Sequence, residues 1–152
     1  MGLGTNLGDR EANISEALKR LGDAFGCDSS ALSGFYETEP WGFESEDKFL
    51  NAAVRYDLAM SPEEILGICK SIERKMGRPD GKPEYGPDGK RIYSSRIVDI
   101  DILLYGTETI DLPDLKIPHP LMSVREFVMK PLSEIISDNM RAAFPALFEE
   151  YC

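Results

Sequence analysis

The chain has 152 residues, 42% of them hydrophobic, which suits one domain with a sizeable core. Its net charge of −10 argues against general binding to nucleic acid or anionic membranes, and no apolar run is long enough to span a bilayer. Three cysteines without metal-ligand spacing, together with the lack of a signal-peptide pattern, favour a reduced, cytoplasmic protein.

The first ten residues are rich in glycine, and we expect tight turns there. Asp9 is a good N-cap for a helix over about 10–21 that stops at Gly22. The Gly4-x-x-x-Gly8 spacing lacks the Lys-Ser/Thr pair of a P-loop, so it is a weak phosphate-binding motif.

Two strands and a helix are predicted next. Residues 32–38 read as a strand, and the turn after it carries Trp41, which either flanks a ligand or covers a core edge. Residues 50–58 alternate between apolar and other side chains, which predicts a strand with one core face. A capping box at 61–64 and an apolar stripe then predict a helix that ends at Gly77.

The segment that follows is basic and rich in turn residues. Residues 78–95 contain many Gly, Pro, Asp and Lys, and we expect a mobile loop without structure of its own, either a functional lid or a disordered insert. Residues 70–96 carry eight basic and four acidic side chains, so they sum to +4 while the remainder sums to −14. Part of this charge lies on a solvated helix face, but the excess also suits the oxygens of a polyphosphate.

Two carboxylates lie in the strand predicted over 97–106. Asp99 and Asp101 share one face, because side chains alternate along a strand, and the opposite face is wholly apolar. An ionised carboxylate among aliphatic neighbours costs several kcal/mol unless a cation or hydrogen bonds compensate it. Mg²⁺ takes one or two protein carboxylates together with phosphate oxygens and water, so the pair predicts a Mg-nucleotide site. The alternative is a solvated sheet face.

The last third of the chain predicts short elements. Residues 106–114 suggest a hairpin or short edge strand. The only histidine, His119, lies between two prolines in a loop, where a single histidine more often has no catalytic role. A helix begins over 123–130, Pro131 interrupts it, and the helical tail breaks again at Pro145. Without a regular βαβ rhythm, we expect an α+β fold: a mainly antiparallel sheet, related to ferredoxin-like folds, with helices on its faces.

These motifs together resemble the 6-hydroxymethyl-7,8-dihydropterin pyrophosphokinase family, which transfers the diphosphate of ATP to a pterin hydroxymethyl group in folate biosynthesis. The resemblance spans nearly the whole chain, in family order, and rests on the segments at 4–10, 35–38 with Pro40, 49–52, 72–73, 77–78, 96–106, 117–120, 125–127 and 130–132.

The resemblance implies a site for two small molecules, ATP and the pterin, with two Mg²⁺ ions. The metal ligands would be Asp99 and Asp101. The catalytic set would add two phosphate-binding arginines, Arg78 and Arg96. The ATP site would contain Glu73, Arg78, His119 and Arg125. The pterin site would contain Thr38, Phe49, Asn51, Tyr93 and Phe127, with the two phenylalanines on either side of the ring. A monomer that binds neither nucleic acid nor membrane is expected.

The chain departs from the family pattern in three places. Tyr93 stands where Trp is common, with Ser94-Ser95 in place of Gly-Pro. The loop up to Arg96 is long, so roles for Lys82, Lys90 and Arg91 are not transferred. Only Met1–Leu3 precede the glycine segment, which leaves little room for a first strand.

Two other functions stay open at this point. One is a different Mg-dependent nucleotidyl or phosphoryl transferase that uses the same carboxylates. The other is a non-catalytic regulatory domain that binds nucleotide. No strong general base is evident, and Asp101 or a metal-bound water would accept a proton if one must be accepted.

Overall fold

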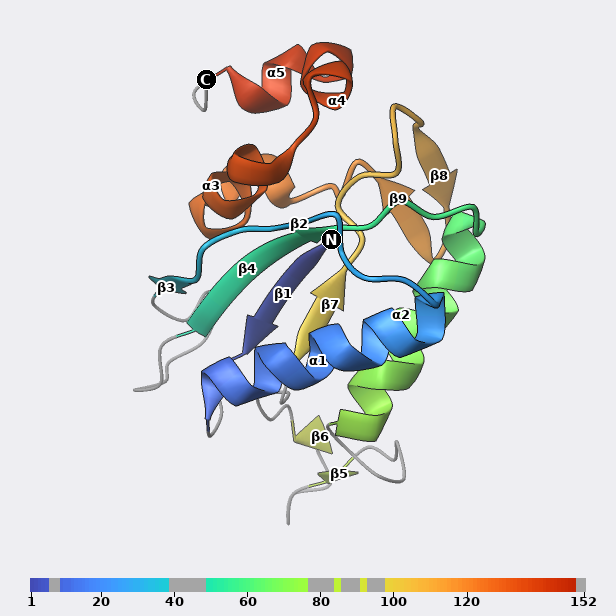
Figure 1. Cartoon of the computed structure of the whole chain (residues 1–152), viewed down its shortest axis with the longest axis vertical. Coiled ribbons are helices and arrows are strands. Elements are labelled where there is room, and N and C mark those ends of the chain that lie inside the picture. Colours follow the sequence, from blue (N-terminus) through green and yellow to red (C-terminus); the bar gives the residue numbers. More distant parts are fainter. Residues whose placement is uncertain (6–8, 39–48, 77–83, 86–90, 93–97, 150–152) are drawn as a thin grey trace.

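The computed structural model describes residues 1–5, 9–38, 49–76, 84–85, 91–92 and 98–149. Its centre is a five-stranded antiparallel sheet in which β4 lies between β1 and an edge shared by β2 and β3, while β7 flanks β1 on the other side (Figure 1). The strands are β1 (Gly2–Thr5), β2 (Ala31–Leu32), β3 (Tyr36–Thr38), β4 (Phe49–Arg55) and β7 (Asp99–Asp101).

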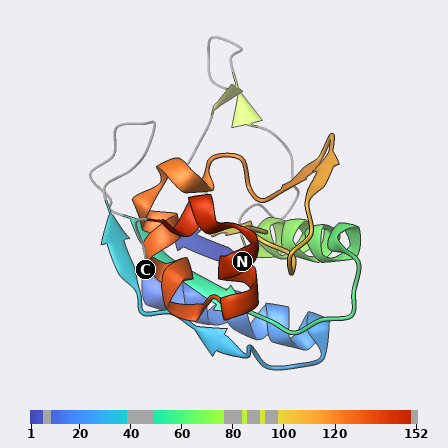
Figure 2. The same cartoon turned by 90° about the horizontal axis from the view of Figure 1, so that it is seen from above.

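Helices cover both faces of this sheet. The first two, α1 (Arg10–Phe25) and α2 (Pro62–Met76), pack against β1, β4 and β7 on one face, and α3 (Glu126–Ile135) packs against β4 and β3 on the other (Figures 1 and 2). Two short helices, α4 (Asp138–Ala143) and α5 (Pro145–Phe148), follow α3. The order β1-α1-β2/β3-β4-α2-β7 is that of a ferredoxin-like domain, so the predicted α+β class is confirmed.

Helix α1 begins where the sequence predicts and ends later. The Asp9 carboxylate accepts a hydrogen bond from the Ala12 N–H at 3.1 Å, as an N-cap should. Gly22 lies inside the helix, and the C-cap is Gly26, whose φ of 71° is left-handed and needs glycine. The apolar stripe around Ile14 extends the helix past the first glycine, because it stays buried against the sheet.

Helix α2 matches the prediction closely. The Ser61 hydroxyl accepts from the Glu64 N–H at 3.3 Å, which is the predicted capping-box bond. Ile65, Cys69 and Ile72 are buried, and they hold the helix on the sheet.

Strand β4 has two core faces, so the prediction of one was wrong. Leu50 and Val54 pack in the core under α1 and α2, and Ala53 packs in the core under α3. The strand also ends at Arg55 instead of continuing to residue 58. A central strand between two helical layers is buried on both sides, and only small side chains fit where α3 approaches closely.

The N-terminal glycines are extended rather than in turns. Gly2 and Gly4 lie in β1, opposite Ala53 and Asn51 of β4 and opposite Asp101 and Asp99 of β7. The strand predicted over 97–106 is regular only in β7, because its ladder with β1 ends at Asp101. Beyond it Leu103 is buried in the core under α3.

Four other predictions also needed correction. The strand predicted over 32–38 is split into β2 and β3, which pair with successive parts of β4. The loop predicted over 78–95 contains a two-stranded ladder of β5 (Glu84–Tyr85) and β6 (Arg91–Ile92), and the rest of it lies outside the described residues. Figure 1 shows this ladder at the end of the molecule where β7 begins, opposite α4 and α5.

The predicted hairpin near 106–114 lies slightly later, as β8 (Ile110–Leu112) and β9 (Leu115–Ile117). Pro131 does not interrupt α3 but lies buried inside it. Burial of Met129, Leu132 and Ile135 against the sheet outweighs the hydrogen bond that proline cannot make. Within the described ranges, no helix is both long and apolar enough to cross a lipid bilayer.

Candidate active site

Four residues from four strands form a row across the face of the sheet that α3 partly covers. The strand register sets Asp99 opposite Gly4, Gly4 opposite Asn51, and Asn51 opposite Tyr36. Residues opposite one another in an antiparallel pair point to the same face. Leu3 and Ile100, one position away, point to the other face and into the core under α1 and α2. The row therefore brings a carboxylate, a glycine, an amide and a phenol side by side.

Asp99 and Asp101 lie on this face as the sequence predicts, and each is half-buried. Their strand neighbours, Gly4 and Gly2, have no side chains, and the Asn51 amide and the Leu103 side chain lie over them. Hard cations prefer oxygen ligands of this type. Within the described residues no third Asp, Glu, His or Cys completes a metal cluster, so other oxygens would have to fill the coordination sphere.

Asn51 is buried, and its Oδ1 lies over Gly4. Its Nδ2 donates to the backbone carbonyl of Tyr36 at 3.4 Å, which ties its amide to β3. Phe49, two residues earlier on β4, lies on the same face, and its backbone pairs with Thr38. The structure thus brings together three of the residues predicted for the pterin, with the side chain of Thr38 outside the described part.

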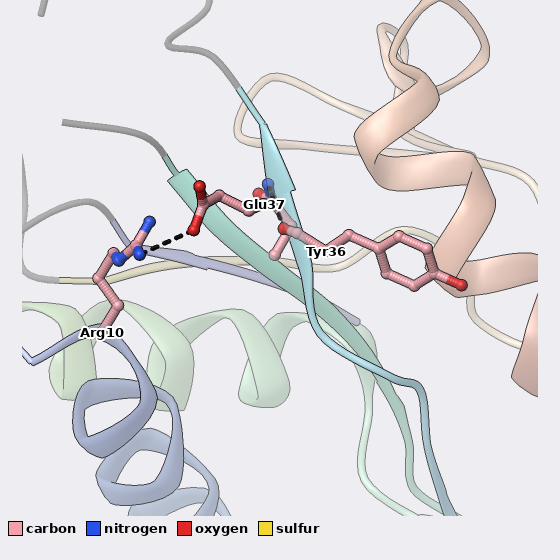
Figure 3. Close-up of polar contacts among 4 residues, drawn as sticks. Arg10, Tyr36 and Glu37 are labelled. Atoms are coloured by element: carbon pink, nitrogen blue, oxygen red, sulfur yellow. Dashed lines mark hydrogen bonds and ion pairs between the residues drawn. The ribbon is translucent and has the colours of Figure 1, made fainter. Parts of the chain in front are cut away.

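Strand β3 is anchored on both sides. Figure 3 shows Glu37 pointing toward α1, where it forms an ion pair with Arg10 at 2.9 Å, and Tyr36 pointing the other way. The Tyr36 hydroxyl donates to the Glu134 carboxylate of α3, which also accepts from the Gly34 N–H at 3.1 Å. This carboxylate raises the pKa of Tyr36, because it stabilises the protonated phenol.

Glu73 lies on the other side of β7. It is 9% exposed, and its Oε2 accepts from the Ile100 N–H at 3.1 Å, while Lys70 lies 3.5 Å from Oε1. Ile100 stands between the two aspartates, so this bond fixes the backbone that carries them. Glu73 was predicted for the ATP site, and this hydrogen bond links it from helix α2 to strand β7, which carries Asp99 and Asp101.

The loop after β9 carries His119 close to the same strand. The His119 N–H donates to the Leu103 carbonyl at 3.1 Å, two residues beyond Asp101. Its Nδ1 accepts from the Leu121 N–H at 3.3 Å, so the neutral ring carries its proton on Nε2.

Arg125 and Phe127 lie at the start of α3. The Arg125 guanidinium is 6.0 Å from the centre of the Phe127 ring, so the residues predicted for ATP and for pterin are neighbours here. Both are half-buried. Of the other predicted residues, Arg78, Tyr93 and Arg96 lie outside the described part of the chain, and their roles stay predictions.

Sequence reasoning missed two members of this site. Gly4 was assigned to a turn, and the backbone carbonyl of Tyr36 was not considered. The alternation of Gly2, Leu3, Gly4 and Thr5 is a period-2 pattern, which is the signal that could have indicated a strand with a bare face.

A cavity of about 630 Å³ lies at the other end of β4. Its lining is mainly apolar and includes Tyr56, Leu58, Leu104, Tyr105 and Ile135. Among the described residues, none of those predicted for ATP, pterin or metal lines it. The candidate site is therefore the carboxylate row and not this cavity.

Comparison with known proteins agrees with the family resemblance of the sequence motifs. The family model for 7,8-dihydro-6-hydroxymethylpterin-pyrophosphokinase matches residues 1–137. A 2-amino-4-hydroxy-6-hydroxymethyldihydropteridine pyrophosphokinase from Porphyromonas gingivalis is 45% identical over 136 residues, 89% of this chain and 88% of the relative. Proteins of the same name from Methylorubrum extorquens and Bacillus subtilis are 38% and 37% identical, over 91% and 95% of this chain and 82% and 81% of their own.

Proposed function

Because the chain belongs to the 7,8-dihydro-6-hydroxymethylpterin-pyrophosphokinase family, we propose that it transfers the diphosphate of ATP to the hydroxymethyl group of 6-hydroxymethyl-7,8-dihydropterin, with release of AMP. The observation that carries this proposal is the row in which Asp99 and Asn51 flank Gly4. One end of the row suits a cation and its phosphates, and the other suits the hydrogen-bonding edge of a flat ring.

The carboxylate end fits Mg²⁺. The backbone positions of Asp99 and Asp101 are about 6.6 Å apart along one face of the strand, a spacing at which two short carboxylate side chains can bind neighbouring cations. We propose that these residues hold two Mg²⁺ ions, which when bound neutralise charge on the ATP phosphates.

The chain's own residues orient ATP. Glu73 keeps the backbone of β7 in place through Ile100, so the two carboxylates hold their relative position during transfer. The Nε2–H of His119 is a donor suited to a phosphate oxygen or to the nucleoside. Arg125 adds a cation beside the ring of Phe127, and Arg78 and Arg96 are proposed as further phosphate ligands.

The acceptor end orients the pterin. The Asn51 amide offers both a donor and an acceptor to the amide-like edge of the ring, and Phe49 with Phe127 supplies aromatic faces. The pterin hydroxyl oxygen then attacks the β-phosphorus in line and gives its proton to Asp101 or to water, while the bond from that phosphorus to the α-phosphate oxygen breaks and AMP leaves. Alignment and charge neutralisation supply most of the catalysis in such transfers.

An AMP-release assay with ATP, Mg²⁺ and the pterin tests the proposal. We expect pterin-dependent AMP from the wild type, and Asp99→Asn/Asp101→Asn should lower the turnover by about a thousandfold or more, because charge neutralisation is lost. Asp111→Asn is the matched control, since Asp111 is an exposed aspartate in β8. EDTA should abolish turnover, and added Mg²⁺ should restore it without a change in melting temperature.

The products separate this reaction from its alternatives. Release of inorganic pyrophosphate in place of AMP would indicate another nucleotidyl transferase with the same carboxylates. ATP binding without any turnover by a folded wild type would contradict the proposal and favour a regulatory domain. We further propose that the protein acts in the cytoplasm as a monomer. Sedimentation of the purified chain would test the oligomeric state.

A further inference from the structure

We propose that Gly4 is a positioning residue for pterin binding, because its missing side chain leaves the space over β1 to the Asn51 amide. The inference rests on the proposed function and extends it to a residue that makes no side-chain contact. The two glycines of β1 provide the comparison that supports it.

Gly4 occupies the gap between the two ends of the site. Adjacent strands lie about 4.8 Å apart, so the Asp99 and Asn51 backbones are about 10 Å apart with Gly4 between them. Any side chain at this position would project from the floor of the site midway between the carboxylate and the amide. Glycine is therefore the only residue that keeps this floor flat.

The Asn51 amide already lies over Gly4. A Cβ added at Gly4 would be 3.0 Å from the Asn51 Oδ1 and 3.8 Å from Cδ1 of Phe49. The first distance is too short, so the amide would have to move by a few tenths of an ångström or rotate. That movement would strain the bond from Asn51 Nδ2 to the Tyr36 carbonyl, which holds the amide in its present orientation.

Gly2 provides the contrast within the same strand and on the same face. A Cβ at Gly2 would meet Cδ1 of Leu103 at 3.3 Å, which is the far end of a flexible side chain. Leu103 is an apolar core residue outside the row of Asp99, Gly4, Asn51 and Tyr36, so a small shift of its side chain leaves the Asn51 amide in place. An alanine at Gly2 should thus be tolerated where one at Gly4 is not.

Steady-state kinetics of Gly4→Ala and Gly2→Ala test the proposal. For Gly4→Ala we expect the KM for the pterin to rise about tenfold or more, with the KM for ATP within about twofold of the wild-type value. Gly2→Ala should keep both within about twofold. Equal increases in both KM values for Gly4→Ala, or a pterin KM that stays at the wild-type value, would overturn the proposal.

A second measurement does not depend on turnover. In ¹H–¹⁵N spectra, Gly4→Ala should shift the side-chain NH₂ signals of Asn51, assigned from their loss in Asn51→Ala, and Gly2→Ala should leave them in place. Unshifted signals would overturn the proposal. A wild type that forms no AMP would instead refute the proposed function, while this measurement would still report on Gly4.

A folding defect can be distinguished as well. If Gly4→Ala lowers the melting temperature of the wild type, the same change should have little effect on the melting temperature of Asn51→Ala. The reason is that the crowded Oδ1 is absent from that background. A defect of equal size in both backgrounds would show that Gly4 acts on something other than Asn51, and would overturn the proposal.

Discussion

Glu73 joins helix α2 to strand β7 through a hydrogen bond that its carboxylate accepts from the Ile100 N–H. The strand is the last one on its side of the sheet, so this N–H has no strand partner among the described elements. A buried N–H without an acceptor costs about 1–3 kcal/mol. The Glu73 carboxylate therefore stabilises the fold, in addition to its predicted place in the ATP site.

Two substitutions at Glu73 separate the acceptor from the charge. Glu73→Ala should lower the free energy of unfolding by about 1–3 kcal/mol more than Glu73→Gln, because glutamine keeps a carbonyl acceptor for Ile100. Urea unfolding of both variants measures the difference. Equal stability of the two variants would mean that the hydrogen bond contributes nothing. A raised KM for ATP in the stable Gln variant would in turn support the predicted role of the charge.

Helices α1 and α2 differ in what their glycines do. Gly26 ends α1 with a left-handed φ of 71°, whereas Gly67 lies in the middle of α2 with nothing within 4 Å of an added Cβ. Glycine is required at the first position and only weakens the helix at the second. The same residue type therefore has opposite effects in the two elements.

Alanine at each glycine should show this directly. Gly67→Ala should raise the free energy of unfolding by about 0.5–1 kcal/mol, because alanine restricts the unfolded chain and fits the exposed helix face. Gly26→Ala should lower it by about 1 kcal/mol, because a Cβ is strained in the left-handed region. Thermal or urea unfolding checks both, and a change of the same sign in both variants would contradict the argument.

Cys69, in the core under α1 and α2, and Tyr56, packed against that core, link the stability of the whole molecule to pH. Burial raises the pKa of Cys69 from 9.0 to about 12 and that of Tyr56 from 10.0 to about 12, because it disfavours the thiolate and the phenolate. The Tyr56 ring packs edge-on against Phe25, with centroids 5.0 Å apart. In the unfolded chain both groups ionise at their ordinary values, so above pH 9 the native state holds more protons.

Stability should consequently fall as the pH rises from about 9 toward 12, and be unaffected by these groups below 9. Urea unfolding at about pH 8 and about pH 10.5 measures the decline, which Cys69→Ala should reduce by up to about 2 kcal/mol and Tyr56→Phe should also reduce. Ile65→Val is the control, since it perturbs the same core without a titratable group and should lower stability equally at both pH values. A decline that is identical in all four proteins would refute the linkage.

The sequence alone determined the features that depend on local pattern. The capped helix over 62–76, the α+β class and the shared face of Asp99 and Asp101 follow from capping, periodicity and strand alternation, which need no distant partner. Family resemblance added the reaction and most of the residues examined at the site. The local features are encoded within a few consecutive residues, and the reaction was inferred from motifs along the whole chain.

Tertiary structure decided what depends on residues far apart in the chain. The glycines of β1 are extended because β4 and β7 pair with them, and β4 is buried on both faces because α3 covers the second one. Pro131 stays helical because its neighbours are buried. The role of Gly4 depends on Asn51, 47 positions away, whose amide fills the space that a side chain at Gly4 would need. Local sequence carries no information about that contact.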